Sequence, residues 1–132
     1  MPISVYISPE QLQRQAPDYP GTTVDLAVSS AVPGADMYGG TVTLDPGVKI
    51  ELHYHSQFEL QYVVSGSGTA FDSTGAELQI EQGGFVLSPA GREGAHGFRA
   101  SADEPLTILF LYPTAGGHGP DRFAFENGAD RA

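Results

Sequence analysis

The sequence predicts an all-β fold, either a β-sandwich or a small closed barrel. Turn-forming residues recur at short, regular intervals between Pro33 and Pro105, and the stretches between them have the length of β-strands. The chain has 132 residues, which is enough to bury one hydrophobic core and gives no reason to expect a second domain. So many short strands in one domain of this size are typical of a sheet that closes on itself.

In chain order, the first element expected is a strand at residues 3–7, followed by one short helix. Ser8 is a suitable N-cap, Pro9 fits the first turn, and the helix should end before Pro17. Further strands are expected at residues 22–28, 37–44, 48–55, 58–65, 68–72, 77–81, 85–88, 95–99 and 106–112. The tail from residue 114 is rich in glycine, and its Phe123 and Phe125 are able to tether it by packing. The last few residues are expected to be disordered.

Composition narrows the range of partners. Sixteen acidic and six basic residues give a formal net charge of -10, which argues against nucleic acid and anionic membranes. No apolar run reaches membrane-spanning length, and the N-terminal sequence lacks the basic and hydrophobic regions of a signal peptide. A cytoplasmic location is therefore expected. The chain has no cysteine, which excludes disulfides, thiolate ligands and a thiol nucleophile.

A metal site is indicated between Gly47 and Gly66. If the stretch up to His55 is a strand, His53 and His55 point to the same face, because side chains at i and i+2 share a face. Ser56 and Gln57 suit a reversal of the chain, which would bring Glu59 back beside the two histidines. Imidazole and carboxylate ligands suit zinc, manganese, iron or nickel, and the residues alone do not choose among these metals.

A fourth ligand is offered by the segment 83–98, which contains Gly83, Pro89-Ala90-Gly91 and His96. Together the two segments resemble the motifs of the metal-dependent cupins. The first matches the family pattern of Gly, five residues, His-x-His, three residues, Glu, six residues and Gly at every position. The second has four residues between Gly91 and His96 where two are usual, and Ala100 where the family often has Asn.

The resemblance implies a double-stranded β-helix, the jelly-roll barrel of the cupins, with His53, His55, Glu59 and His96 as metal ligands. The whole chain, residues 1–132, is expected to form a single domain. Its metal-binding core would span about 37–113, preceded by an N-terminal arm at 1–36 and followed by a tail at 114–132. The fourth histidine, His118, lies in the glycine-rich run 116–120 and is expected to be in a flexible loop without a ligand role.

Strand parity predicts which other residues line the cavity. Lys49 and Glu51 would share the face of His53, with a mutual ion pair as the alternative for Lys49, and Gln61 and Val63 would share the face of Glu59. An inward polar group needs a partner, so we expect Glu51 and Gln61 to support a ligand or contact substrate. On the strand 106–112, Leu106, Ile108, Phe110 and Tyr112 form one face, and its apolar members are expected to be core. Tyr112 is a candidate catalytic residue, and a phenolic base would come from Tyr112, Tyr38 or Tyr54.

The opposite parity predicts a partner surface. Tyr54, Leu60 and Tyr62 would face outward, and the apolar strand at 3–7 could add to the sheet edge of a neighbour. A homodimer is therefore expected.

Three neutral imidazoles and one carboxylate leave a divalent transition metal with a net charge of about +1 and about two open positions in a six-coordinate site. Such a centre would attract a small oxygenated or anionic substrate. The leading hypothesis is an O2-dependent dioxygenase, with Fe(II) favoured and Mn, Ni or Zn as alternatives. A non-oxidative Lewis-acid lyase, isomerase, decarboxylase or polyketide-type cyclase is the second hypothesis, and a small-ligand-binding cupin without catalysis is the third.

Overall fold

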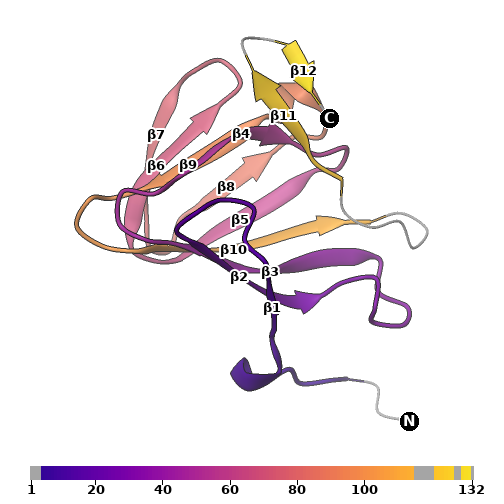
Figure 1. Cartoon of the computed structure of the whole chain (residues 1–132). Helices are drawn as coiled ribbons and strands as arrows, with labels where there is room; N and C mark the ends of the chain where they lie inside the picture. The colour runs from indigo at the N-terminus through magenta and orange to yellow at the C-terminus, as the bar shows by residue number, and fades with distance from the viewer. Residues whose placement is uncertain (1–3, 115–120, 127–128, 132) are drawn as a thin grey trace.

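The fold consists of two six-stranded antiparallel sheets, as the computed structural model in Figure 1 shows for residues 4–114, 121–126 and 129–131. The first sheet has the order β1-β2-β3-β10-β5-β8 and the second has the order β12-β11-β4-β9-β6-β7. The strands are β1 (Gln13–Gln15), β2 (Thr22–Val28), β3 (Met37–Leu44), β4 (Lys49–Tyr54), β5 (Glu59–Ser65), β6 (Ser67–Asp72), β7 (Glu77–Glu81), β8 (Phe85–Ser88), β9 (His96–Ala100), β10 (Leu106–Pro113), β11 (Phe123–Glu126) and β12 (Ala129–Arg131). This arrangement fits a jelly roll, and the predicted all-β class is confirmed.

The core lies where the two sheets face each other. Leu44 pairs with Leu106 and Val63 pairs with Ile108 across neighbouring strands of the first sheet, and these four side chains are almost completely buried. From the second sheet, Ile50, Ala70 and Phe98 join the same cluster. The predicted core roles of Val63, Leu106 and Ile108 are thus confirmed. The remaining space between the two sheets holds the candidate site.

The N-terminal predictions need correction. Residues 4–7 form no strand, and Val5 and Tyr6 are 75% and 79% exposed. The predicted helix is only a 3-10 turn, η1 (Pro9–Gln11), which a capping box between Ser8 and Gln11 stabilises. The chain then continues as β1 instead of a second helical turn, because it pairs with β2 and Arg14 forms an ion pair with Asp25 there. Residues 9–15 contain a single apolar side chain besides Pro9, Leu12, so a longer helix would have no apolar face to pack against the core.

The C-terminal tail contains strands that the sequence did not predict. β11 pairs with β4, placing Phe123 opposite Tyr54 and Ala124 opposite His53, and β12 pairs with β11. Two segments of four and three residues carry too little periodicity to be recognised as strands. No helix in the described parts of the chain is long and apolar enough to cross a membrane.

Candidate metal centre

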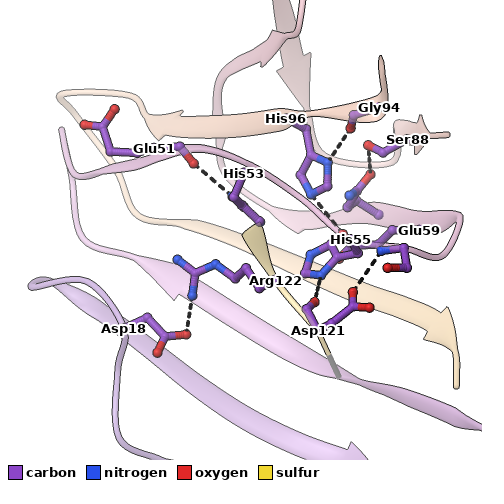
Figure 2. Close-up of polar contacts among 12 residues, drawn as sticks. Asp18, Glu51, His53, His55, Glu59, Ser88, Gly94, His96, Asp121 and Arg122 are labelled. Atoms are coloured by element: carbon purple, nitrogen blue, oxygen red, sulfur yellow. Dashed lines mark hydrogen bonds and ion pairs between the residues drawn. The ribbon is translucent and has the colours of Figure 1, made fainter. Parts of the chain in front are cut away.

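The residues of the two sequence motifs meet between the two sheets. His53 lies on β4, His55 follows the end of β4, and His96 is the first residue of β9, directly opposite His53. Glu59 begins β5 of the facing sheet and lies beside His55 and His96, as Figure 2 shows. All four side chains are buried, and one ligating nitrogen from each histidine lies within 4.8 Å of the others. The structure therefore brings the four predicted ligands together, whereas His118 lies outside the described residues.

Hydrogen bonds fix how each imidazole is presented. Nδ1 of His53 donates to the Glu51 carbonyl at 2.8 Å, Nδ1 of His96 donates to the Gly94 carbonyl at 2.9 Å, and Nδ1 of His55 donates to the Asp121 carbonyl. Because Nδ1 carries the hydrogen in each neutral ring, the lone pair is on Nε2. Orientation of this kind by a backbone carbonyl is typical of metal-ligating histidines.

Glu59 supplies a test of whether a cation fits. Its Oε1 lies 3.2 Å from Nε2 of His55 and 2.9 Å from Nε2 of His96, and this oxygen is buried without a hydrogen-bond donor. With neutral imidazoles, two nitrogen lone pairs and a carboxylate oxygen would face one another in a buried space, which is costly. Positive charge between them removes the repulsion, so the donor set fits a divalent metal ion.

The protonation states agree with this arrangement. Burial lowers the pKa of His53 from 6.5 to about 3, and the neighbouring His96 and His55 add to the effect, so this ring is neutral at physiological pH. Burial acts to raise the pKa of Glu59, but His55 and His96 outweigh it and lower this pKa to about 2. For His55, burial acts in the lowering direction, but Glu59 and the Asp121 carbonyl dominate and raise its pKa. In the metal-free protein, a proton on His55 is the natural substitute for the cation.

Glu51 is not a pocket residue, contrary to the parity prediction. Its side chain is 67% exposed and forms an ion pair with Lys49 at 3.5 Å. The cause is a β-bulge: Ile50 pairs with Phe98 but His53 pairs with His96, so two residues of β4 face Gly97 alone. The extra residue reverses the alternation, which turns Ile50 inward and Glu51 outward while His53 stays inward. Only the backbone carbonyl of Glu51 serves the site.

Gly97 makes room for this bulge. A Cβ atom on residue 97 would lie 2.6 Å from the carbonyl oxygen of Ile50 and 3.2 Å from backbone atoms of Glu51 and Leu52. A side chain there would collide with backbone, which is unable to move aside as a flexible side chain can. The position of His53 thus depends on Gly97, which follows His96 but is not one of the residues that define the second motif.

A cavity of about 340 Å³ opens beside the four ligands. Gln61 and Tyr112 both line it, as the parity prediction required. Gln61 is 1% exposed; its Oε1 accepts a hydrogen bond from Ser88 at 3.2 Å, and its Nε2 has no partner. The ring of Tyr112 stacks on His55 with centroids 4.6 Å apart. Burial, with a smaller effect from Glu59, raises the pKa of Tyr112, so its hydroxyl stays protonated at neutral pH.

Several pocket residues escaped prediction because they come from outside the two motifs. The remaining polar lining comes from Asp18, Tyr19, Thr22, Tyr38, Asp121 and Arg122. Arg122 forms an ion pair with Asp18 at 2.7 Å and lies over the ring of Tyr19, to whose hydroxyl it also donates. Thr22 and Tyr38 lie on predicted strands, but parity did not place them in the cavity. The other four flank Gly-rich or Pro-rich stretches, where the sequence gives no periodic signal for burial.

The family model described as "Cupin domain" matches residues 40–112, more than half of the chain, and this match contains all four ligands. The chain belongs to the cupin superfamily. Solved structures agree: a polyketide cyclase, RemF from Streptomyces resistomycificus, superposes with a TM-score of 0.72 at 18% identity, covering 97% of this chain and 90% of that one. A sugar phosphate isomerase of the cupin superfamily from Silicibacter pomeroyi gives 0.70 at 25% identity, covering 84% and 76%.

A third similar structure is a cupin-2 domain protein from Rhodospirillum rubrum, with a TM-score of 0.68 and 23% identity, covering 89% of this chain and 78% of that one. Among curated proteins, none matches the sequence. The resemblance to solved structures is therefore one of fold and does not carry a particular reaction to this cupin.

The irregular second motif of this cupin has a simple structural explanation. The four residues between Gly91 and His96 include a 3-10 turn, η2 (Arg92–Gly94), which takes up the two extra residues before β9 begins. The turn places the Gly94 carbonyl where His96 donates to it, and the backbone N–H of Gly91 donates to the carbonyl of His55 at 2.8 Å. The insertion therefore supports the position of His96.

Proposed function

We propose that this cupin is a metal-dependent enzyme that moves protons on a small, oxygenated and largely apolar substrate, as a lyase, isomerase or cyclase. One observation carries the proposal: the pocket holds a buried phenol, Tyr112, and a buried amide, Gln61, on the same cavity as the four candidate metal ligands. A divalent cation bound by His53, His55, Glu59 and His96 would polarise a carbonyl or stabilise an enolate.

The chain's own residues supply the remaining functions. Tyr112 keeps its proton at neutral pH, so it acts as a hydrogen-bond donor or general acid and not as the resting base considered from sequence. The unpartnered Nε2 of Gln61 is available to donate to a substrate oxygen, while Ser88 holds the other end of the amide. Tyr38, whose ring centroid is 5.4 Å from that of Tyr112, places a second phenol on the cavity.

The pocket walls indicate the class of substrate. Much of the lining is apolar or aromatic: Val24, Val42, Ile50, Phe98, Ile108, Phe110 and the rings of Tyr19, Tyr38 and Tyr112. The one cation among the described lining residues, Arg122, is already paired with Asp18. Of the oxygenated or anionic substrates considered from sequence, an uncharged molecule with an aromatic or similarly flat body and oxygen atoms at one end suits this cavity better than an anionic one.

Two of the three similar structures named above have described activities, and both activities are non-oxidative. RemF is described as a polyketide cyclase and resembles this chain over nearly the full length of both. The protein from Silicibacter pomeroyi is described as a sugar phosphate isomerase. These likenesses support proton-transfer chemistry as the first hypothesis to test, and the hydrophobic walls favour a cyclase-like substrate over a sugar phosphate.

An O2-dependent dioxygenase is the second candidate. The observation that favours it is the ligand set itself, since three imidazoles and one carboxylate leave about two positions open in a six-coordinate site. Iron would be the metal for that reaction, and zinc would not support it because zinc has no accessible redox change.

The two candidates separate in one experiment. Metal-free protein is loaded in parallel with Zn(II) and Fe(II) and given an aryl β-hydroxyketone in D₂O, once without oxygen and once in air. Proton transfer predicts deuterium exchange at the carbon next to the carbonyl, or loss of water, followed by NMR, and a large decrease in the Tyr112→Phe variant. Turnover seen only with Fe(II), in step with O2 consumption, would establish the dioxygenase instead. Tight binding of the ketone with no turnover under either condition would indicate a ligand-binding cupin.

A further inference from the structure

The three imidazoles of the candidate metal centre differ in where their orienting carbonyl comes from. For His53 and His96 it lies two residues earlier in the chain, at Glu51 and Gly94. For His55 it belongs to Asp121, 66 residues away in the C-terminal segment. The two local carbonyls are placed by β4 and by the turn η2, each next to its histidine in the chain. The third is in place only when the C-terminal segment is docked.

Residues 121–125, which we call the C-terminal strap, are attached to the site at several points. The Asp121 carboxylate accepts a hydrogen bond from the backbone N–H of Ser56 at 2.8 Å. Phe123 pairs with Tyr54 across β11 and β4, and their rings stack with centroids 5.2 Å apart. Phe125 lies under the Arg92 guanidinium, 4.3 Å from its ring centroid. Each contact is made to a residue next to a metal ligand or in the turn that precedes His96.

The C-terminal strap also crosses to the N-terminal part of the chain. Arg122 pairs with Asp18 at 2.7 Å and packs on Tyr19, and Figure 2 shows it reaching from the strap toward Asp18 below His53. Asp18, Tyr19, Asp121 and Arg122 all line the cavity. The strap therefore forms one wall of the pocket and contributes to the metal centre at the same time.

We propose that the C-terminal strap is a positioning element of the metal centre, so that docking of the strap and binding of the metal stabilise each other. Docking fixes Nδ1 of His55 as the donor and directs Nε2 toward the other ligands. Metal binding in turn holds His55 in the orientation that the Asp121 carbonyl requires. This coupling rests on the metal centre of the proposed function but not on any reaction, because neither of its tests measures turnover.

The first test uses the unmodified protein. Trypsin cleaves after arginine, and cleavage after Arg122 requires the strap to leave β4. Arg14, on the short edge strand β1, pairs with Asp25 on the protein surface and provides a reference site in the same digest. We expect saturating Zn(II) to slow cleavage after Arg122 by tenfold or more and to leave cleavage after Arg14 unchanged, as followed by mass spectrometry. Equal slowing at both sites, or at neither, would overturn the proposal.

The second test uses variants. Asp121→Ala and Phe123→Ala should each weaken Zn(II) binding by roughly tenfold, the effect usual for groups that support a ligand. Asp121→Asn lacks the charge but keeps an oxygen for the Ser56 N–H, so it should bind within about threefold of the wild type. Phe85→Ala breaks a comparable ring pair with Tyr62, at 4.7 Å on the other sheet, and is the matched control.

The absorption spectrum of the Co(II)-loaded protein reports the geometry of the ligands around the metal. A general loss of stability does not change this spectrum as long as the protein is folded. Asp121→Ala should alter the ligand-field bands, whereas Asp121→Asn and Phe85→Ala should keep them. Wild-type affinity and spectrum in both Asp121→Ala and Phe123→Ala would show that the strap is only a covering strand.

Discussion

Nδ1 of His53 donates a hydrogen bond to the carbonyl of Glu51 at 2.8 Å, although the side chain of Glu51 points into solvent. The β-bulge opposite Gly97 makes this possible, because it rotates Glu51 outward while its carbonyl stays within reach of the ring. A residue beside the site thus contributes through its backbone, and its side chain is free to pair with Lys49.

We expect His53→Ala, His55→Ala, Glu59→Ala and His96→Ala each to lower metal content sharply, because each removes one of four converging donors. Metal analysis of protein purified without chelators or a histidine tag measures this. Glu51→Gln is the control, since this side chain lies outside the pocket, and it should retain metal and any turnover. Full metal content in His96→Ala would remove His96 from the ligand set.

Gly97→Ala should lower both the free energy of unfolding, by roughly 1–3 kcal/mol, and metal affinity. The added Cβ would lie 2.6 Å from the Ile50 carbonyl, so the bulge must open and His53 must move. Urea unfolding and a metal titration report the two effects. Gly84→Ala, where the nearest backbone atom would be 3.3 Å away, is the milder comparison. Unfolding and binding identical to wild type in Gly97→Ala would show that the bulge does not position His53.

The metal-free protein should be most stable near pH 6.5. Below that pH, unfolded His53 takes up a proton that the folded protein, with its pKa of about 3, does not, so stability falls with falling pH. Glu59 acts in the same direction below pH 4.5, its ordinary pKa, because its folded pKa is about 2. Above 6.5 the raised pKa of His55 has the opposite sign, and its stabilising effect is lost as pH rises.

Urea unfolding of the chelated protein between pH 3 and 8 would trace this curve, and one proton contributes a slope of at most about 1.4 kcal/mol per pH unit. His53→Gln should flatten the acid side between pH 6.5 and 4.5. An equally steep acid side in that variant would contradict the assignment to His53.

Tyr112→Phe and Gln61→Leu should lower turnover by roughly 10²-fold or more while metal content stays within a few per cent of wild type. Both side chains line the cavity, and neither is a ligand. The ratio of turnover to bound metal is the quantity to compare. A parallel loss of metal and turnover would instead indicate that these residues only support the metal centre.

A homodimer through the outer face of the first sheet remains our expectation. Phe85, Tyr62 and Leu109 form one row across β8, β5 and β10, and Leu87, Leu60 and Leu111 form the next. Phe85 and Leu87 are 63% and 60% exposed, and the two rows contain no charge in a chain of net charge -10. Two copies could therefore bring these faces together without opposing their carboxylates.

Light scattering at micromolar concentration should give twice the chain mass, and Leu87→Lys should give the monomer. A monomeric wild type would refute the dimer. The predicted strand at residues 3–7 was one argument for the dimer, and this argument is withdrawn because residues 4–7 form no strand.

The turn spacing was sufficient to predict the all-β class and most strand positions, and the two motifs predicted which four candidate ligands the fold brings together. Periodicity and turn residues act over a few positions, and the spacing His-x-His followed by Glu59 places donors together through local geometry alone. The predictions for Gln61 and Tyr112 also held as placements in the cavity, because β5 keeps regular alternation through Glu59, Gln61 and Val63.

Only the tertiary structure decided the rest. Glu51 lies outside because a bulge depends on a strand partner, here Gly97 on β9, and single-sequence parity contains no information about the partner. The hydrogen bond from His55 to the Asp121 carbonyl joins residues 66 positions apart in the chain, and the ion pair of Arg122 with Asp18 joins residues 104 positions apart. Such contacts form when the sheets pack and bury their shared surface, so no local pattern in the chain encodes them.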